Sequence, residues 1–168
     1  MKTVKIAIVH DDPVLMNRLR EIVWSDSRHQ VAWVAYRPGE AVLKCSEERP
    51  DLILMGVNLA DRGGVRATKT IMEESPCPIL LVSDNPEADA PLVFEAMGYG
   101  ALDVIKAPAA EPPAGDPGGA LALLKKIQTF GKLQALSPPR FESPGKAKKK
   151  PCPLPPLIVI GASTGGPK

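Results

Sequence analysis

The stretch that decides the fold is Ile6-Ala7-Ile8-Val9-His10-Asp11-Asp12-Pro13. Its first four residues form a short, continuous apolar run, which is typical of a strand buried on both faces of a sheet. Asp12 followed by Pro13 favours the start of a helix, because aspartate caps free backbone N–H groups and proline fits the first helical position. A buried strand that leads directly into a helix indicates an α/β unit.

The same unit recurs along the chain. Apolar runs predict further strands at residues 31–35, 52–55, 78–82 and 103–105. Apolar residues at helical spacing predict helices at residues 13–24, 39–48, 63–74, around 92–97, and 121–136. Five alternations of apolar strands with helices predict an α/β fold with a doubly wound, five-stranded parallel sheet. In such a sheet, functional groups gather at the carboxyl ends of the strands.

Composition divides the chain near residue 136. Residues 1–136 carry 15 Lys and Arg against 18 Asp and Glu, whereas residues 137–168 carry 6 against 1, and 12 of the 19 prolines follow residue 106. A stretch rich in proline and lysine is typical of an extended, solvated linker rather than a nucleic-acid-binding site. We therefore predict a domain at 1–136, an interdomain linker at 137–156, and the start of a second, truncated α/β domain at 157–168.

The final stretch predicts a strand followed by the turn Gly161-Ala162-Ser163-Thr164-Gly165-Gly166. A strand that feeds a Gly-x-Ser-x-Gly turn lifts the serine hydroxyl above the sheet as a nucleophile. A phosphate-binding loop is disfavoured, because Pro167-Lys168 replaces the Lys-Ser/Thr pair that it needs, and a purely structural turn is the other alternative. If Ser163 is the catalytic nucleophile, its histidine base must come from elsewhere in the protein, and this chain alone should be inactive.

Asp11 and Asp12 stand where the first strand ends, at the rim of the predicted sheet. Two adjacent carboxylates there can hold Mg²⁺, a hard cation that prefers oxygen ligands. Asp12 can also cap the following helix, and the two roles are compatible. His10 beside the pair could suggest a transition-metal site, but a histidine at a strand end more often packs or faces solvent.

Cysteine usage and hydropathy predict the environment of the protein. Cys45, Cys77 and Cys152 lie far apart in sequence and form no C-x-x-C pair, so we expect reduced thiols, no disulfide framework and no zinc site. The amino terminus lacks the apolar stretch of a signal peptide, and no run reaches the ~18 apolar residues of a membrane span. These features predict a cytoplasmic protein without membrane insertion.

Several stretches together resemble a response-regulator receiver domain, in particular that of chemotaxis methylesterases of the CheB type. They are residues 8–16, 50–55, 78–83 and 100–105, and residues 160–166 resemble the start of that family's methylesterase domain. The resemblance implies a receiver of the flavodoxin-like fold in an enzyme that hydrolyses glutamate methyl esters on chemoreceptors and can deamidate glutamines. It implies chemoreceptors, a chemotaxis histidine kinase and the protein's own catalytic domain as partners.

The chain departs from the family pattern at the phosphorylation site. The family's phosphoacceptor aspartate follows the third strand, where this sequence has Gly56, and glycine cannot carry a phosphoryl group. Asp61, five residues further on, is not expected to replace it. The family's lysine after the fifth strand aligns with Ala107, and Lys106 lies one residue early, which in a strand points its side chain to the opposite face. We therefore predict a degenerate receiver that keeps the fold and lacks phosphoryl chemistry.

The remaining positions of the family's site are partly kept. The resemblance implies that the backbone carbonyl of Asn58 joins Asp11 and Asp12 as a ligand of Mg²⁺, which should bind weakly without a carboxylate at position 56. Ser83 ends the fourth strand, and two interpretations stay open: the family's switch hydroxyl, or a cap of the next helix. The alternative function is a non-enzymatic pseudo-receiver that binds a partner protein through its fourth helix and fifth strand.

Overall fold

The computed structural model describes residues 3–109 and 117–136. Within these ranges the elements are, in chain order, β1 (Val4–Val9), α1 (Pro13–Trp24), β2 (His29–Ala35), α2 (Pro38–Glu47), β3 (Leu52–Gly56), the 3₁₀ turn η1 (Ala60–Arg62), α3 (Gly63–Glu74), β4 (Ile79–Ser83), α4 (Ala90–Gly98), β5 (Asp103–Lys106) and α5 (Pro117–Leu136). The predicted linker at 137–156 and the predicted strand at 157–168 lie outside the described residues. No helix in the described part of the chain is long and apolar enough to cross a membrane.

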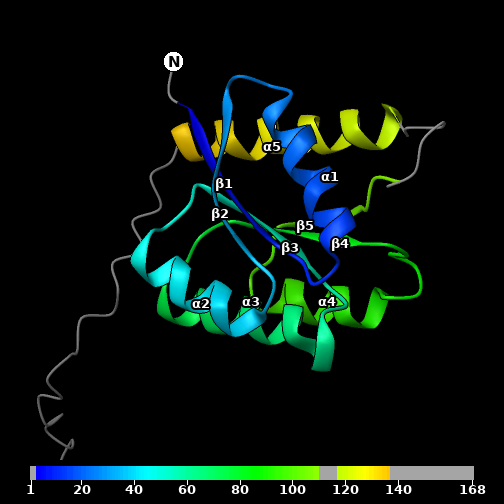
Figure 1. The fold of residues 1–168 in the computed structure, drawn as a ribbon. Coiled ribbons are helices and arrows are strands. Elements are labelled where there is room, and N and C mark those ends of the chain that lie inside the picture. The colour runs from blue at the N-terminus through cyan, green and yellow to red at the C-terminus, as the bar shows by residue number, and fades with distance from the viewer. Residues whose placement is uncertain (1–2, 110–116, 137–168) are drawn as a thin grey trace, which may run out of the picture.

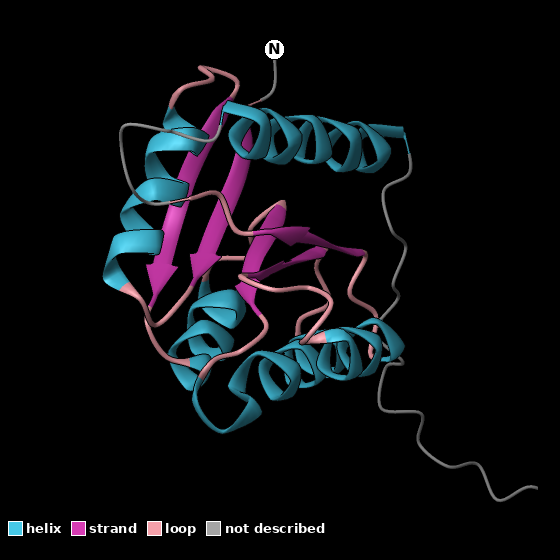
Figure 2. Cartoon of the chain, turned by 90° about the vertical axis from the view of Figure 1, so that its right-hand side faces the viewer, coloured by secondary structure: helices cyan, strands magenta, loops and turns pink. Residues whose placement is uncertain are grey.

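The strands form one parallel sheet with the order β2-β1-β3-β4-β5. Helices α2, α3 and α4 cover one face, and α1 and α5 cover the other (Figures 1 and 2). The chain winds in one direction from β1 to β2 and in the other from β1 through β3 to β5, so the predicted doubly wound α/β fold is confirmed.

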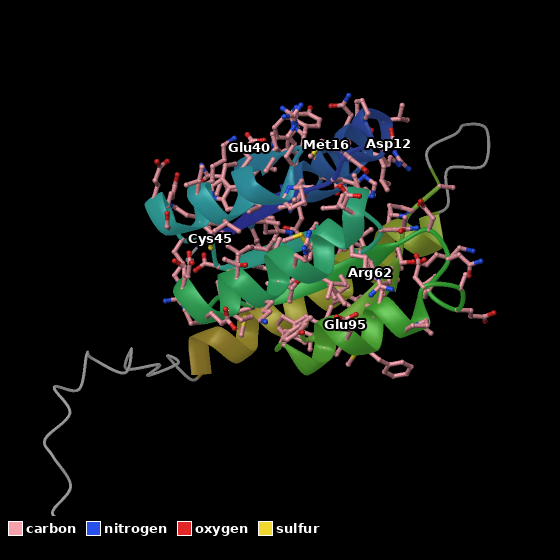
Figure 3. All side chains as sticks on the ribbon, turned by 90° about the horizontal axis from the view of Figure 1, so that it is seen from below. Asp12, Met16, Glu40, Cys45, Arg62 and Glu95 are labelled. Atoms are coloured by element: carbon pink, nitrogen blue, oxygen red, sulfur yellow. The ribbon has the colours of Figure 1, made fainter. Side chains whose placement is uncertain are left out.

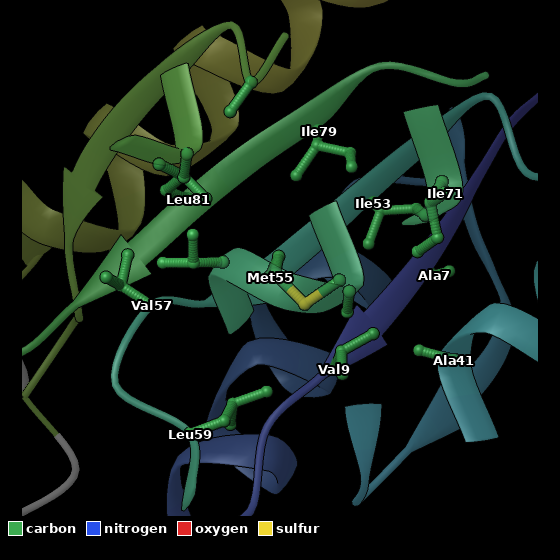
Figure 4. Packing of buried hydrophobic residues seen from close by; sticks show 14 of the residues in the cluster. Ala7, Val9, Ala41, Ile53, Met55, Val57, Leu59, Ile71, Ile79 and Leu81 are labelled. Atoms are coloured by element: carbon green, nitrogen blue, oxygen red, sulfur yellow. The ribbon is translucent and has the colours of Figure 1, made fainter. Parts of the chain in front are cut away.

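The core has two layers because successive residues of a strand point to opposite faces of the sheet. In β1, Ala7 and Val9 pack under α2, α3 and α4, whereas Ile6 and Ile8 pack under α1 and α5. Figure 4 shows the first layer, in which β1, β3 and β4 contribute aliphatic side chains and Met55. Both faces of the central strands are therefore apolar, which explains the continuous apolar runs in the sequence.

The start of α3 packs tightly against the end of β3. A Cβ atom added at Gly64 would collide with the carbonyl oxygen of Gly56 and lie 2.7 Å from that of Val57. These neighbours are backbone atoms at the end of central strand β3 and of the residue after it, and they cannot turn aside as a flexible side chain can. Glycine at position 64 therefore allows the helix to close over the carboxyl edge of the sheet.

We expect Gly64→Ala to lower the free energy of unfolding by at least about 2 kcal/mol, because the overlap forces a backbone shift. Gly39 in α2 is the matched control, since a Cβ there would meet no atom within 4 Å. Gly39→Ala should leave stability unchanged or raise it by up to about 1 kcal/mol. Urea unfolding of the two variants measures the difference, and equal midpoints would show that the contact at Gly64 relaxes freely.

Candidate functional site

The carboxyl edge of the sheet brings together most of the residues predicted for the site. Val9 pairs with Met55, and Gly56 pairs with Val82. Because β1, β3 and β4 are parallel neighbours, His10, which follows Val9, lies beside Gly56, which follows Met55. Ser83, which follows Val82, lies on the other side of Gly56, at the end of β4. Asp11 and Asp12 continue from His10 on the same rim. Ser163, the predicted nucleophile, lies outside the described residues.

The two predicted carboxylates have different surroundings. Asp12 adopts an extended backbone conformation, and its Oδ1 accepts a hydrogen bond of 2.8 Å from the N–H of Val14, so it caps α1 as expected. The side chain of Asp11 is 47% exposed, and its Oδ1 lies 3.4 Å from Nδ1 of His10. One carboxylate thus caps the helix, and the other lies half-exposed at the rim beside His10.

His10 occupies the space beside Gly56. A Cβ at position 56 would lie 2.8 Å from Cδ2 and 3.2 Å from Nε2 of His10, and 3.0 Å from Cδ2 of Leu59. The imidazole is held in place because its Nδ1 accepts the N–H of Asp12 at 3.1 Å. Its side chain is only 12% exposed. The ring therefore fills the place into which an acceptor side chain at position 56 would project.

The contact between His10 and Gly56 was not predicted from the sequence. Each residue stands at the carboxyl end of an apolar run, which is a usable signal. The signal becomes specific only when the strand order is known, since β1 and β3 must be neighbours for the two positions to touch.

Ser83 is buried, and its hydroxyl both donates and accepts a hydrogen bond. Its Oγ donates a hydrogen bond of 2.6 Å to Oδ2 of Asp89 and accepts the N–H of Asn85 at 3.1 Å. The following helix begins only at Ala90, so the hydroxyl holds the β4–α4 loop rather than capping that helix. In this conformation Ser83 faces the start of α4.

The end of β5 carries no lysine directed like the family's. Ile105 and Ala107 both pack in the layer under α1 and α5, so Lys106 between them points to the opposite side and is exposed. The backbone N–H of Ala107 donates to the carbonyl of Ser83 at 2.8 Å, which keeps this segment attached to β4.

The loop between β3 and α3 is tied to α4 at its far end. Asp61 and Arg62 both have left-handed backbones, with φ values of 57° and 56°. The guanidinium of Arg62 lies 3.9 Å from the Glu95 carboxylate of α4, and Figure 3 shows the two side chains next to each other. Asp61 and Asn58 are exposed in this loop.

The oxygen donors at this edge fit a divalent cation poorly. One oxygen of Asp12 accepts a hydrogen bond from the first turn of α1, and Gly56 has no side chain. The ring of His10 occupies the place of a third carboxylate. No group of three or more His, Cys, Asp or Glu side chains among residues 3–109 and 117–136 is arranged to hold a metal ion. Mg²⁺ binding by Asp11, Asp12 and the Asn58 carbonyl stays a prediction.

The comparisons with known proteins identify the class. Residues 6–112 match the sequence model of the response regulator receiver domain, and this chain belongs to that family. It is 43% identical over 97% of its length to a protein-glutamate methylesterase/protein-glutamine glutaminase 1 of Pseudomonas fluorescens. It is 42% identical, also over 97%, to a protein-glutamate methylesterase/protein-glutamine glutaminase of Mesorhizobium japonicum. The chain covers 48% of each of these relatives, so it spans about half of their length.

A solved structure supports the same assignment. The response regulator domain of Thermotoga maritima CheB superimposes with a TM-score of 0.70 and 29% sequence identity, covering 78% of this chain and 98% of that one. The resemblance to CheB-type methylesterases is therefore confirmed at the level of sequence and fold.

Proposed function

We propose that this chain is the regulatory part of a chemotaxis protein-glutamate methylesterase, whose catalytic part begins near Ser163. The observation that carries the proposal is the extent of the identity. Similarity to the methylesterases runs over 97% of the chain, well past the receiver match that ends at residue 112. The substrates would be glutamate methyl esters of chemoreceptors, with glutamine deamidation as a second activity.

We also propose that the receiver works without phosphoryl transfer to position 56. Gly56 offers no nucleophile, and His10 with Leu59 fills the adjoining space. Ser83 is committed to Asp89, and Lys106 points away from the face of Ala107. Control of the catalytic part is then constitutive or depends on protein contact. Chemotaxis signalling proteins, including chemoreceptors and a histidine kinase, are the expected partners.

The test combines the size of the native protein with its activity. An immunoblot of source cells with antibodies against residues 1–136 should detect a product about twice the 17.9 kDa of this chain, because the chain covers 48% of its relatives. Methyl release from methylated receptors by that product should not change when acetyl phosphate and Mg²⁺ are added. A product near 17.9 kDa would overturn the enzyme proposal, and stimulation by acetyl phosphate would overturn phosphorylation-independent control.

A partner-binding pseudo-receiver is the second candidate, and the α4–β5 surface favours it. Phe94 on α4 is 72% exposed, and Leu102 before β5 is 43% exposed, with Met97 also on the surface. Large apolar side chains grouped on a surface favour protein contact. A native product no longer than this chain would support this candidate, whereas in a longer protein the surface is available to the catalytic part.

A further inference from the structure

Two of the three cysteines meet in the folded chain, although they are 32 positions apart. Cys45 lies on α2 and Cys77 lies just before β4, and their sulfur atoms are 3.7 Å apart. Both are buried, with exposures of 1% and 3%, and both are free thiols. Reduced thiols without a disulfide framework stay a prediction, and the fold brings together two cysteines that lie far apart in the sequence.

The pair lies away from the carboxyl edge described above. Cys77 precedes the first residue of β4, which places it at the amino edge of the parallel sheet. Cys45 is near the end of α2, which runs back toward that same edge, and Figure 3 shows it well apart from Asp12. Chemistry at these sulfurs is therefore independent of the Gly56 site.

The surroundings of the two sulfurs are unequal. Contact with the Cys77 thiol lowers the pKa of Cys45, and the charge of Arg49 acts in the same direction although burial opposes it. The contact with Cys45, followed by burial, raises the pKa of Cys77 well above its usual range. These pKa directions favour Cys45 as the sulfur that reacts first, once the 3.7 Å contact from its thiol to the carbonyl oxygen of Ser75 is broken.

We propose that Cys45 and Cys77 are a redox modification site that closes to an intrachain disulfide when the protein meets a peroxide. The sulfurs need to approach by less than about 2 Å to reach bonding distance. Because both are buried, reaction requires local opening of the end of α2, a helix of ten residues with few buried side chains. The resulting bond would tie α2 to the entry of β4.

The chemistry balances in two steps. The Cys45 thiolate attacks one peroxide oxygen, the O–O bond breaks, and Cys45 sulfenic acid and hydroxide form. The Cys77 sulfur then attacks the Cys45 sulfur, the S–O bond breaks, and the Cys77 proton leaves with the hydroxyl as water. The two sulfurs together lose two electrons, which reduce the peroxide to the level of water.

Peptide mapping after hydrogen peroxide treatment tests the proposal on the full chain. We expect a peptide containing Cys45 joined to one containing Cys77, with the mass of two hydrogen atoms lost and restored by dithiothreitol. The oxidised chain should also show a higher thermal midpoint than the reduced chain, because the bond restricts the unfolded state.

Single-residue variants distinguish a Cys45–Cys77 disulfide from a disulfide that involves Cys152. Cys152→Ser is the matched control and should keep the joined peptide, whereas Cys45→Ala and Cys77→Ala should lose it. If either buried variant fails to fold, mapping of the wild-type chain alone decides. Failure to find the joined peptide, or finding Cys45 or Cys77 linked only to Cys152, would overturn the proposal.

Discussion

The Gly56→Asp variant is expected to gain little phosphoryl label from acetyl phosphate and Mg²⁺, whereas His10→Asp/Gly56→Asp should gain about tenfold more. The reason is steric. A side chain at position 56 meets the ring of His10 within 2.8 Å of its first carbon atom. Such an overlap costs about 1–3 kcal/mol, and each 1.4 kcal/mol changes an equilibrium by about tenfold.

His10→Asp also adds a negative charge at the rim of the sheet. Asp12 accepts a hydrogen bond from the N–H of Val14, whereas Asp11 lies half-exposed beside His10. Aspartate at position 10 would place a second free carboxylate beside Asp11 and facing position 56. Two such oxygens next to a new acceptor form a better Mg²⁺ site than the native residues do.

The matched controls are the wild-type chain and His10→Asp alone, which both keep Gly56 and should remain unlabelled. Label on the double variant should be stable in acid and labile in base, as expected of an acyl phosphate. Equal labelling of Gly56→Asp and the double variant would show that His10 moves aside at no cost. Labelling of the wild-type chain would instead reveal a different acceptor, such as Asp61. Ala107 in place of lysine limits the label in every variant.

The strands were predictable from sequence because the central sheet is buried on both faces. Leu52 to Met55 and Ile79 to Val82 are uninterrupted apolar runs, and their short length together with the proline before each favours strands over buried helix segments. Helix ends were less predictable. We placed the start of the last helix at residue 121, whereas α5 begins at Pro117, because Gly118 and Gly119 are poor helix formers that tertiary packing overrides.

The contacts that decide the chemistry were not predictable in the same way. His10 against Gly56 and Cys45 against Cys77 each join segments more than 30 residues apart. Periodicity gives the elements but not their order in the sheet, and the order β2-β1-β3-β4-β5 is what brings these pairs together. Motif comparison did identify Gly56 as the altered position, and the structure adds the side chain that fills the space beside it.

Replacing Ser163 by alanine should lower methyl release by the native, full-length protein at least about a thousandfold. If Ser163 is the nucleophile, its oxygen forms the bond to the acyl carbon, and only binding and transition-state contacts remain once it is removed. The loss should appear in kcat, with KM little changed, because the hydroxyl acts on the reacting carbonyl. Release of methanol from methylated receptors measures it.

Thr164→Ala is the matched control, since it removes a hydroxyl from the adjacent position of the same turn and should retain most of the activity. Loss in Thr164→Ala with activity kept in Ser163→Ala would contradict the assignment. We do not expect the general base to be one of the receiver's histidines. His10 is packed beside Gly56, and His29 is buried, which lowers its pKa and keeps it from solvent. If Ser163 is the nucleophile, we expect its histidine to come from outside the receiver and the isolated 168-residue chain to show no activity.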